Sequence, residues 1–277
     1  MRPTVVIGAI APHGELAIAE ACDAQTVELA PRTQQATAEL GRRVIAAQPD
    51  TVVIATPHNV HVVGHLAVLT AGQLAGVLED APRPLTLRCR VDRELALETV
   101  HQLAEAGLPA VAVSFGANSP AESVAPLDWG ALVPLWPILQ AAPNLPVVLV
   151  APARELDADA HRRAGAALVR AARALGRRVA VIASADQGHG HRADGPYGYT
   201  PASAAFDARV ADLVQRGALA DLLAMDPAEV EAAVADSWWQ MLLLHGALEE
   251  DGAPFVPELL AYEVPTYYGM LTAVLTA

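Results

Sequence analysis

Three histidines follow apolar, strand-like runs of the sequence, each near the point where its run ends. Imidazole nitrogens that come from separate rigid elements are good ligands for a divalent metal ion. In an open α/β sheet, chemistry collects where the strands end, so such histidines can meet at one edge. The three pairs of run and histidine are 4–10 with His13 in "APHGE", 51–56 with His58 in "TPHNVH", and 178–184 with His189 in "SADQGHGH".

A proline stands immediately before His13 and before His58. Proline disfavours a helical conformation for the residue that precedes it, so both histidines are expected on extended backbone. Two histidines and one carboxylate with open coordination positions form the iron(II) site of non-haem oxygenases. The same ligand types also bind zinc. The pattern therefore predicts a metal centre and leaves the identity of its ion open.

Strand-like and helical patterns alternate along the chain. Continuous apolar runs such as 51–56, 109–115 and 145–152 are typical of strands that are buried on both faces of a parallel sheet. Amphipathic segments at 33–48 and 157–176 predict helices between them. We therefore predict one α/β domain over residues 1–277, with a mostly parallel central sheet, helices on both faces and the site at the carboxyl ends of the strands.

Other parts of the chain are less regular. The runs 65–71 and 85–91 indicate an irregular β region, the chain after Pro201 is mostly helical, and 259–270 predicts a last short strand.

Composition excludes several classes of protein. The net charge is −13 and the chain contains no basic cluster, which disfavours a nucleic-acid partner. No apolar run is long enough to span a membrane and no signal peptide is evident, so a soluble, cytoplasmic protein is expected. Cys22 and Cys89 form no CxxC motif and are predicted to be free thiols.

Six segments together resemble the class III extradiol ring-cleavage dioxygenase superfamily, whose fold is that of the protocatechuate 4,5-dioxygenase catalytic subunit, and also the related Memo-like proteins. The resemblance covers nearly the whole chain. It rests on "APHG" at 11–14, "TPHN" at 56–59, "PLDWGALVPL" at 126–135, "SADQGH" at 184–189, "DSWWQMLLLHGAL" at 236–248 and "YEVPTYYGML" at 262–271.

The resemblance implies that His13 and His58 are metal ligands and that His189 is the active-site acid/base. It also implies Fe(II) as cofactor, with zinc as an alternative, and a small aromatic substrate that reacts with O2. The third ligand of these enzymes is a late glutamate. Asp236 falls in the corresponding position, 47 residues after His189, and Glu263 is the alternative ligand.

Four further residues are candidates for the site. Asp128 stands where the enzymes commonly have a second histidine, and it either binds a cationic group of the substrate or caps the helix that follows. Asp186 is predicted to orient the loop around His189, unless it forms only a local Asx turn. His61 and His191 are candidate substrate-binding groups.

The function suggested by these residues is a non-haem Fe(II) extradiol dioxygenase that cleaves a catechol- or aminophenol-type ring. Two alternatives stay open: a Memo-like metal-binding protein without this activity, and a zinc-dependent hydrolase on the same ligands. Memo-like proteins carry a cysteine where Asp236 stands, and this chain has no cysteine after Cys89. The resemblance and the Trp238–Trp239 pair also suggest a homo-oligomer.

Overall fold

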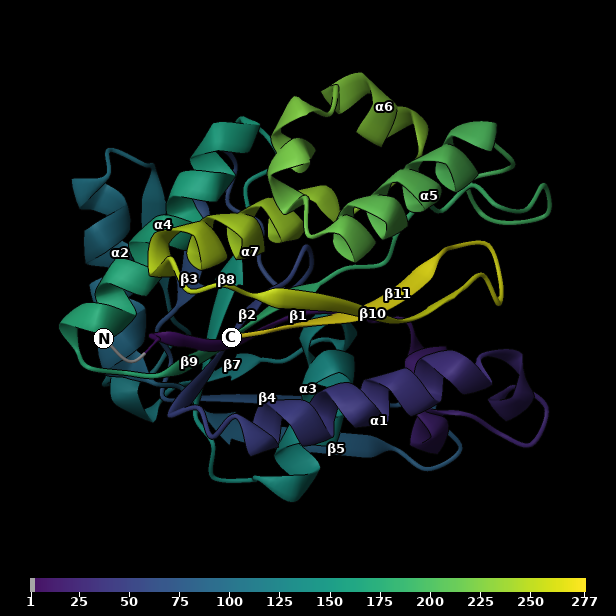
Figure 1. The fold of residues 1–277 in the computed structure, drawn as a ribbon. Coiled ribbons are helices and arrows are strands. Elements are labelled where there is room, and N and C mark those ends of the chain that lie inside the picture. Colours follow the sequence, from purple (N-terminus) through teal and green to yellow (C-terminus); the bar gives the residue numbers. More distant parts are fainter. Residues whose placement is uncertain (1–2) are drawn as a thin grey trace.

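Eight strands form the central sheet of the protein, seen near the middle of the molecule in Figure 1. The computed structural model describes residues 3–277. Their order across the sheet is β10 (Val256–Glu263), β11 (Met270–Thr276), β1 (Val5–Ala11), β9 (Val179–Ser184), β2 (Thr51–Ala55), β8 (Val147–Ala151), β3 (Leu66–Leu69) and β6 (Ala110–Val113).

The four strands β1, β9, β2 and β8 run parallel to one another in the middle of this sheet. Every residue of these four strands is buried, as the continuous apolar runs predict. The register pairs Ala11 with Ser184 and Ala55 with Ala183. The carboxyl ends of β1, β9 and β2 therefore lie side by side, and the loops that follow them begin at one edge.

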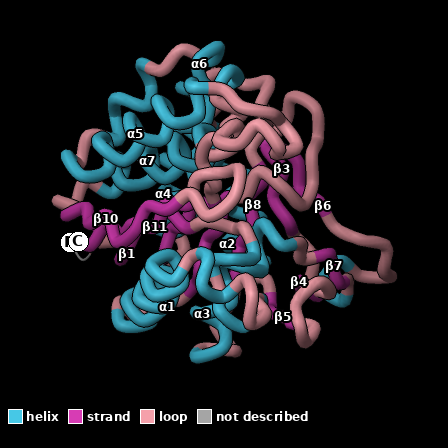
Figure 2. Tube along the Cα trace, turned by 90° about the vertical axis from the view of Figure 1, so that its right-hand side faces the viewer, coloured by secondary structure: helices cyan, strands magenta, loops and turns pink. Residues whose placement is uncertain are grey.

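Helices cover both faces of the sheet, which confirms the predicted α/β architecture. The helices α1 and α3 lie on one face, and α4 and α7 lie on the other with α2 beside α4 (Figures 1 and 2). The α-helices among the described residues are α1 (Pro31–Ala46), α2 (Arg93–Glu105), α3 (Trp129–Ala141), α4 (Ala158–Ala174), α5 (Pro201–Arg216), α6 (Pro227–Ala232) and α7 (Trp238–Asp251). None of the helices within residues 3–277 is long and apolar enough to cross a lipid bilayer.

The irregular β region of the sequence divides between two sheets. The run 65–71 supplies β3 of the main sheet, whereas β4 (Gln73–Leu78), β5 (Leu85–Arg90) and β7 (Val124–Pro126) form a separate sheet of three strands beside α3. The last predicted strand is in fact the hairpin of β10 and β11, in which β11 pairs antiparallel with β1 and β10 pairs antiparallel with β11. These additions make the central sheet mixed, with its parallel part in the middle.

Two glycines allow α4 and α7 to pack closely against each other. A Cβ atom at Gly246 of α7 would overlap the backbone carbonyl of Arg162, and one at Gly165 of α4 would overlap the carbonyl of Leu243. The helix α7 also contacts β9 and β1, so its position depends on this close crossing. The turn that precedes α7 is therefore held at a fixed place relative to the ends of these strands.

We expect Gly246→Ala and Gly165→Ala each to destabilise the protein by about 1–3 kcal/mol, because the added methyl group forces the two helices apart. Alanine would otherwise favour a helix over glycine, so a loss of stability reports the overlap. Urea denaturation measures the free energy of unfolding. Gly116→Ala is the control, since a Cβ atom there has no neighbour within 4 Å. Equal stability of Gly246→Ala and the wild type would contradict the proposed close packing.

Candidate metal centre

His13, His58 and Asp236 meet at the carboxyl ends of β1, β9 and β2. The two imidazole Nε2 atoms are 3.2 Å apart. Oδ2 of Asp236 lies 3.5 Å from Nε2 of His13 and 3.6 Å from Nε2 of His58. Among residues 3–277 these three form the group of histidine and carboxylate atoms that is close enough to hold one metal ion.

The arrangement fits a divalent ion. Two nitrogens bound to one ion at about 2.1 Å and at roughly a right angle would be separated by about 3 Å, close to the observed spacing. His13 and Asp236 are buried, and Oδ1 of Asp236 has no hydrogen-bond partner within residues 3–277. An unpaired buried carboxylate oxygen is costly, and a bound cation removes that cost. The donor set of two imidazoles and one carboxylate suits both Fe(II) and zinc.

Ser184, the last residue of β9, sets the orientation of the His13 ring. Its hydroxyl donates a hydrogen bond to the carbonyl oxygen of Gly130. The same hydroxyl lies 3.0 Å from Nδ1 of His13 and, having used its only proton, must accept that bond. Nδ1 of His13 therefore carries a proton, so Nε2 is the nitrogen that can present a lone pair to a metal ion once its own proton has left.

His58 is aimed by the residue that follows it. Asn59 has a left-handed backbone, with φ of 75°, and its side chain donates a 2.7 Å hydrogen bond to the carbonyl oxygen of Pro126. Its backbone N–H donates to Oδ2 of Asp128 at 2.5 Å. Gly130 leaves room for the ring, because a Cβ atom there would stand 2.8 Å from Cδ2 of His58.

Asp128 thus holds the loop of His58 in place through its hydrogen bond with the backbone of Asn59. It stands at the N-cap position of α3, but its side chain makes no capping hydrogen bond with that helix. The structure gives Asp128 a third task that the sequence did not suggest, because its partner Asn59 is distant in the chain.

Asp236 lies in the turn between α6 and α7. Its backbone carbonyl accepts a 2.6 Å hydrogen bond from Nε2 of Gln240, and the same amide nitrogen donates to the carbonyl of Ser184 at 3.0 Å. Gln240 therefore ties the turn of Asp236 to the end of β9. The alternative ligand Glu263 is engaged elsewhere: Oε2 of Glu263 accepts from the backbone and hydroxyl of Thr33 in α1, at 2.7 and 2.8 Å.

Opposite charges within the cluster shift its proton affinities. Burial alone would lower the pKa of His13, but the carboxylates of Asp186 and Asp236 outweigh it and raise that pKa to about 9. Burial alone would raise the pKa of Asp236, but His13 and His58 hold it well below its usual range. Asp236 is therefore a carboxylate at neutral pH, and a metal ion must displace a proton from His13.

Asp186 is buried beside His13. Its Oδ1 accepts a 3.1 Å hydrogen bond from the backbone N–H of His13, and its Oδ2 lies 3.4 Å from Nε2 of the same residue. Burial raises the pKa of Asp186. Among the hydrogen bonds of residues 3–277, none joins the Asp186 side chain to the backbone around His189, so Asp186 braces the loop of His13 instead.

His189 presents one ring nitrogen to the cleft. Its Nδ1 lies 2.9 Å from the carbonyl oxygen of Val234 and donates to it, which leaves the lone pair on Nε2. Val234 has a φ of 50°, an uncommon conformation for a β-branched residue. The ring of Tyr268 stacks on His189 at a centroid distance of 5.5 Å. Backbone and aromatic contacts together fix the tautomer and direction of this imidazole.

His191 and His61 do not join the cluster. Nε2 of His191 lies 2.9 Å from the buried carboxylate of Asp207, which also accepts from the backbone of Gly188. His191 therefore anchors the loop that carries His189. His61 lies on the surface, where its Nε2 is 3.1 Å from Oε1 of Glu155.

The cluster lies between two connected hollows that share His58, His189, Tyr197 and Asp236. The wider hollow has a volume of about 850 Å³, and its lining combines apolar residues, among them Trp238 and Trp239, with charged residues. The narrower hollow, of about 510 Å³, also contacts His13 and Asp186. We call them the wide lobe and the narrow lobe. Together they leave room for a small organic molecule beside the cluster.

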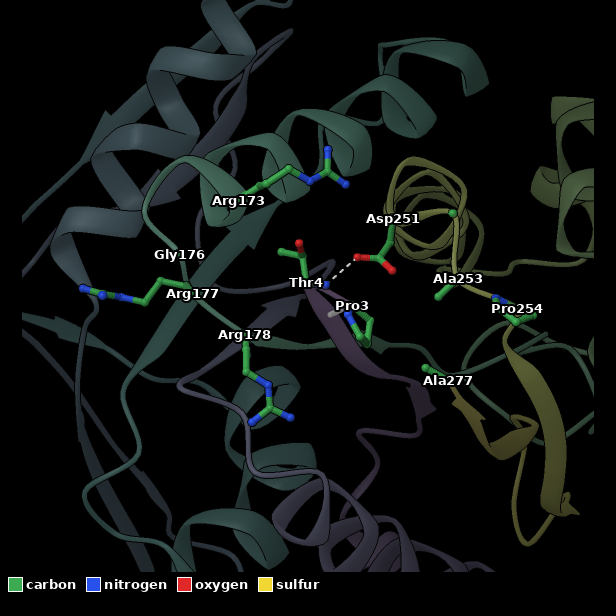
Figure 3. Close-up of a pocket in the computed structure, with 11 residues that line it drawn as sticks. Pro3, Thr4, Arg173, Gly176, Arg177, Arg178, Asp251, Ala253, Pro254 and Ala277 are labelled. Carbon is green, nitrogen blue, oxygen red and sulfur yellow. Dashed lines mark hydrogen bonds between the residues drawn. The ribbon is translucent and has the colours of Figure 1, made fainter. Parts of the chain in front are cut away.

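A further cavity, of about 800 Å³, lies at the opposite edge of the sheet, where β1 and β9 begin (Figure 3). Its most polar residues are already paired: Arg173 with Glu250, Arg177 with Asp92 and Glu94, and Arg178 with the carbonyls of Ala47 and Gln48. Asp251 accepts from the backbone of Thr4, the bond drawn as a dashed line. The histidines and carboxylate predicted for the site lie instead at the other edge of the sheet, where His13, His58 and Asp236 meet.

We expect Asp236→Asn to weaken Co²⁺ binding by at least about 100-fold, because loss of a direct ligand costs more than loss of an outer-shell partner. Glu263→Gln is the matched control and is expected to bind Co²⁺ as the wild type does. Titration of metal-free protein, followed by the visible absorption of Co²⁺, measures both. A loss of affinity in Glu263→Gln rather than in Asp236→Asn would assign the third ligand to Glu263.

Metal affinity should rise with pH. His13 has a pKa of about 9, so at lower pH the metal-free protein holds a proton on His13 that the ion must displace. The apparent association constant for the metal should therefore increase about tenfold per pH unit from pH 7 toward pH 9. Calorimetry in two buffers of different ionisation enthalpy should show about one proton released per ion at pH 7.5. An affinity that does not change over this range would contradict a protonated His13 in the cluster.

The chain is similar to known proteins in both sequence and fold. The chain is 25% identical over 253 residues to the protein CA_C1420 of Clostridium acetobutylicum, a match that covers 91% of this chain and 53% of that protein. The chain thus spans about half the length of that curated relative. The crystal structure of the uncharacterized protein JW3007 from Escherichia coli K12 shares the fold, with a TM-score of 0.65, 15% identity, and coverage of 97% of this chain and 99% of that one.

The family comparison extends over nearly the same residues as the fold. The family model of the catalytic LigB subunit of aromatic ring-opening dioxygenase matches residues 9–274, a range that contains His13, His58, His189 and Asp236. The chain therefore belongs to the LigB family of catalytic subunits of aromatic ring-opening dioxygenases.

Proposed function

We propose that the protein is a non-haem Fe(II) extradiol dioxygenase that cleaves a catechol- or aminophenol-type ring with O2. The observation that carries the proposal is the buried cluster of His13, His58 and Asp236 beside a cleft into which His189 points. The family match supports this reaction over others that the same ligands permit. A bound iron(II) ion supplies redox chemistry with O2 that no side chain of the cluster can provide.

The residues around the cluster suit a flat aromatic molecule. Trp129 packs against His58 with ring centroids 4.7 Å apart, and Tyr268 stacks on His189. Tyr197 borders both lobes. These rings supply apolar faces and edges on which an aromatic substrate can lie. The substrate's two oxygen substituents would then face the cluster.

His189 is the group placed to move protons. Because Val234 accepts the hydrogen bond from Nδ1, Nε2 is free to take a proton from a hydroxyl or amino group of the substrate and to return one later. An imidazole can both accept and donate a proton in general, as these two steps require. Asp207 and His191 hold the loop of His189, and this support keeps Nε2 aimed at the cleft.

A zinc hydrolase and a Memo-like metal-binding protein are the competing functions. The ligand types bind zinc as well as iron, so the geometry of the cluster is compatible with a zinc hydrolase as well as with an iron dioxygenase. Asp236, in place of the cysteine of Memo-like proteins, supports an oxygenase over the second. The family description, an aromatic ring-opening dioxygenase, supports an oxygenase over both.

We expect anaerobic loading with Fe(II), followed by a screen of catechols and aminophenols, to reveal O2 uptake with a coloured ring-cleaved product. His189→Gln should lower kcat by roughly 100- to 10,000-fold, the usual contribution of a general acid–base. Metal binding should be unaffected, because the His189 ring is not among the cluster ligands. His101→Gln, at an exposed histidine of α2, is the control and should keep the wild-type rate.

Two outcomes would overturn the proposal. Zinc-dependent ester hydrolysis without O2 uptake would establish the hydrolase. A metal-dependent complex with another protein, with neither activity, would establish the Memo-like function. Uptake of O2 that does not change in His189→Gln would keep the dioxygenase and remove the role of His189.

A further inference from the structure

Arg154 lies at the end of β8, next to the strand end that carries His58. The strands β2 and β8 are parallel neighbours, with Ala55 paired to Val150. Arg154 follows β8 by three residues and lines the wide lobe together with His58 and Asp236. The same edge of the sheet therefore delivers metal-ligating residues and a guanidinium group to one cleft.

The guanidinium group is supported but not neutralised. Its central carbon lies 4.7 Å from the centroid of the Trp239 ring, a cation–π contact that holds the side chain over the indole. Within residues 3–277, Arg154 makes neither an ion pair with a carboxylate nor a hydrogen bond. Arg162 is a contrasting example, because Asp159 and Glu249 both pair with it. The donors of Arg154 are thus available to a molecule in the lobe.

The charges around the lobe single out Arg154. It is the one arginine or lysine among the residues that line the wide and narrow lobes. Two carboxylates near it are already engaged: Glu155 pairs with His61, and Asp157 accepts from the backbone of Ala160 at the start of α4. Glu231 also lines the wide lobe, without an ion pair to Arg154 among residues 3–277.

We propose that Arg154 binds an anionic substituent of the aromatic substrate, a carboxylate, while the two ring oxygens face the metal cluster. This inference rests on the proposed function, since it assumes that the ring lies in the cleft. A planar guanidinium group matches a carboxylate with two parallel hydrogen bonds, and few other side chains offer that match. Arg154 is then a specificity-determining residue: it acts on the charge of the substrate and not on the bond that breaks.

The test compares an acid with its uncharged ester on protein that cannot turn over. Protein loaded with Zn²⁺, which has no redox chemistry, is titrated with 3,4-dihydroxybenzoate and with its methyl ester, and Trp fluorescence or calorimetry reports binding. We expect Arg154→Gln to weaken binding of the acid by roughly 10- to 100-fold and to leave that of the ester nearly unchanged. Arg154→Lys should retain part of the preference for the acid, because it keeps the charge but loses the planar fork.

Two further variants make the test specific. Arg42→Gln removes an exposed arginine of α1 that pairs with Glu39, and it should change neither affinity. If Arg154 served only to offset the charge of Glu231, the double variant Arg154→Gln/Glu231→Gln would regain acid binding; we expect it to stay weak. Equal weakening of acid and ester in Arg154→Gln, or no weakening of either, would overturn the inference, as would wild-type protein that binds neither compound.

Failure of this inference is distinguishable from failure of the proposed function. O2 uptake by Fe(II)-loaded protein, with an acid-to-ester preference that Arg154→Gln does not alter, would remove the role of Arg154 and keep the dioxygenase. An acid preference that Arg154→Gln abolishes, without O2 uptake by any Fe(II)-loaded sample, would keep the anion site and remove the dioxygenase.

Discussion

The structure depends on one local constraint: two imidazole Nε2 atoms stand 3.2 Å apart, next to a buried carboxylate. The lone pairs of the two imidazoles repel each other, and burial deprives the carboxylate of Asp236 of most of its hydration. A cation or a proton bound between these three side chains removes both costs. A hydrogen bond to Ser184 orients the His13 ring, and the hydrogen bonds of Asn59 hold the loop that carries His58. Several hydrogen bonds of the fold therefore hold in place a group of charged side chains that does not itself stabilise the structure.

The ligands come from two adjacent layers of the molecule, the sheet and the helices packed on it, and packing keeps them together. Gly165 and Gly246 let α4 and α7 approach closely, and this close crossing fixes the position of the turn that carries Asp236 relative to the ends of β1 and β9. Gln240 connects that turn to Ser184, which in turn orients His13. The side chains of Gln240 and Ser184 thus link the candidate metal ligands to the helical layer. A change in helix packing should therefore change the affinity for the metal.

The sequence predicts the strand ends well, because continuous apolar runs identify buried parallel strands and their ends are adjacent by topology. That reasoning places His13, His58 and His189 at one edge, while the choice of Asp236 over Glu263 came from a family resemblance. The tasks of Asp128, Asp186 and His191 could not be predicted, since each depends on a partner distant in the chain. The same holds for Arg154, whose neighbour Trp239 comes from another element, and for the separate sheet of β4, β5 and β7.

The most direct test of the central claim is anomalous diffraction from crystals of Fe(II)-loaded protein grown without oxygen. The geometry predicts a single strong iron peak bound by Nε2 of His13, Nε2 of His58 and a carboxylate oxygen of Asp236, with the remaining coordination positions open to the cleft. An iron peak elsewhere, or a structure in which His13 and His58 do not share one ion, would contradict the metal centre and the function built on it.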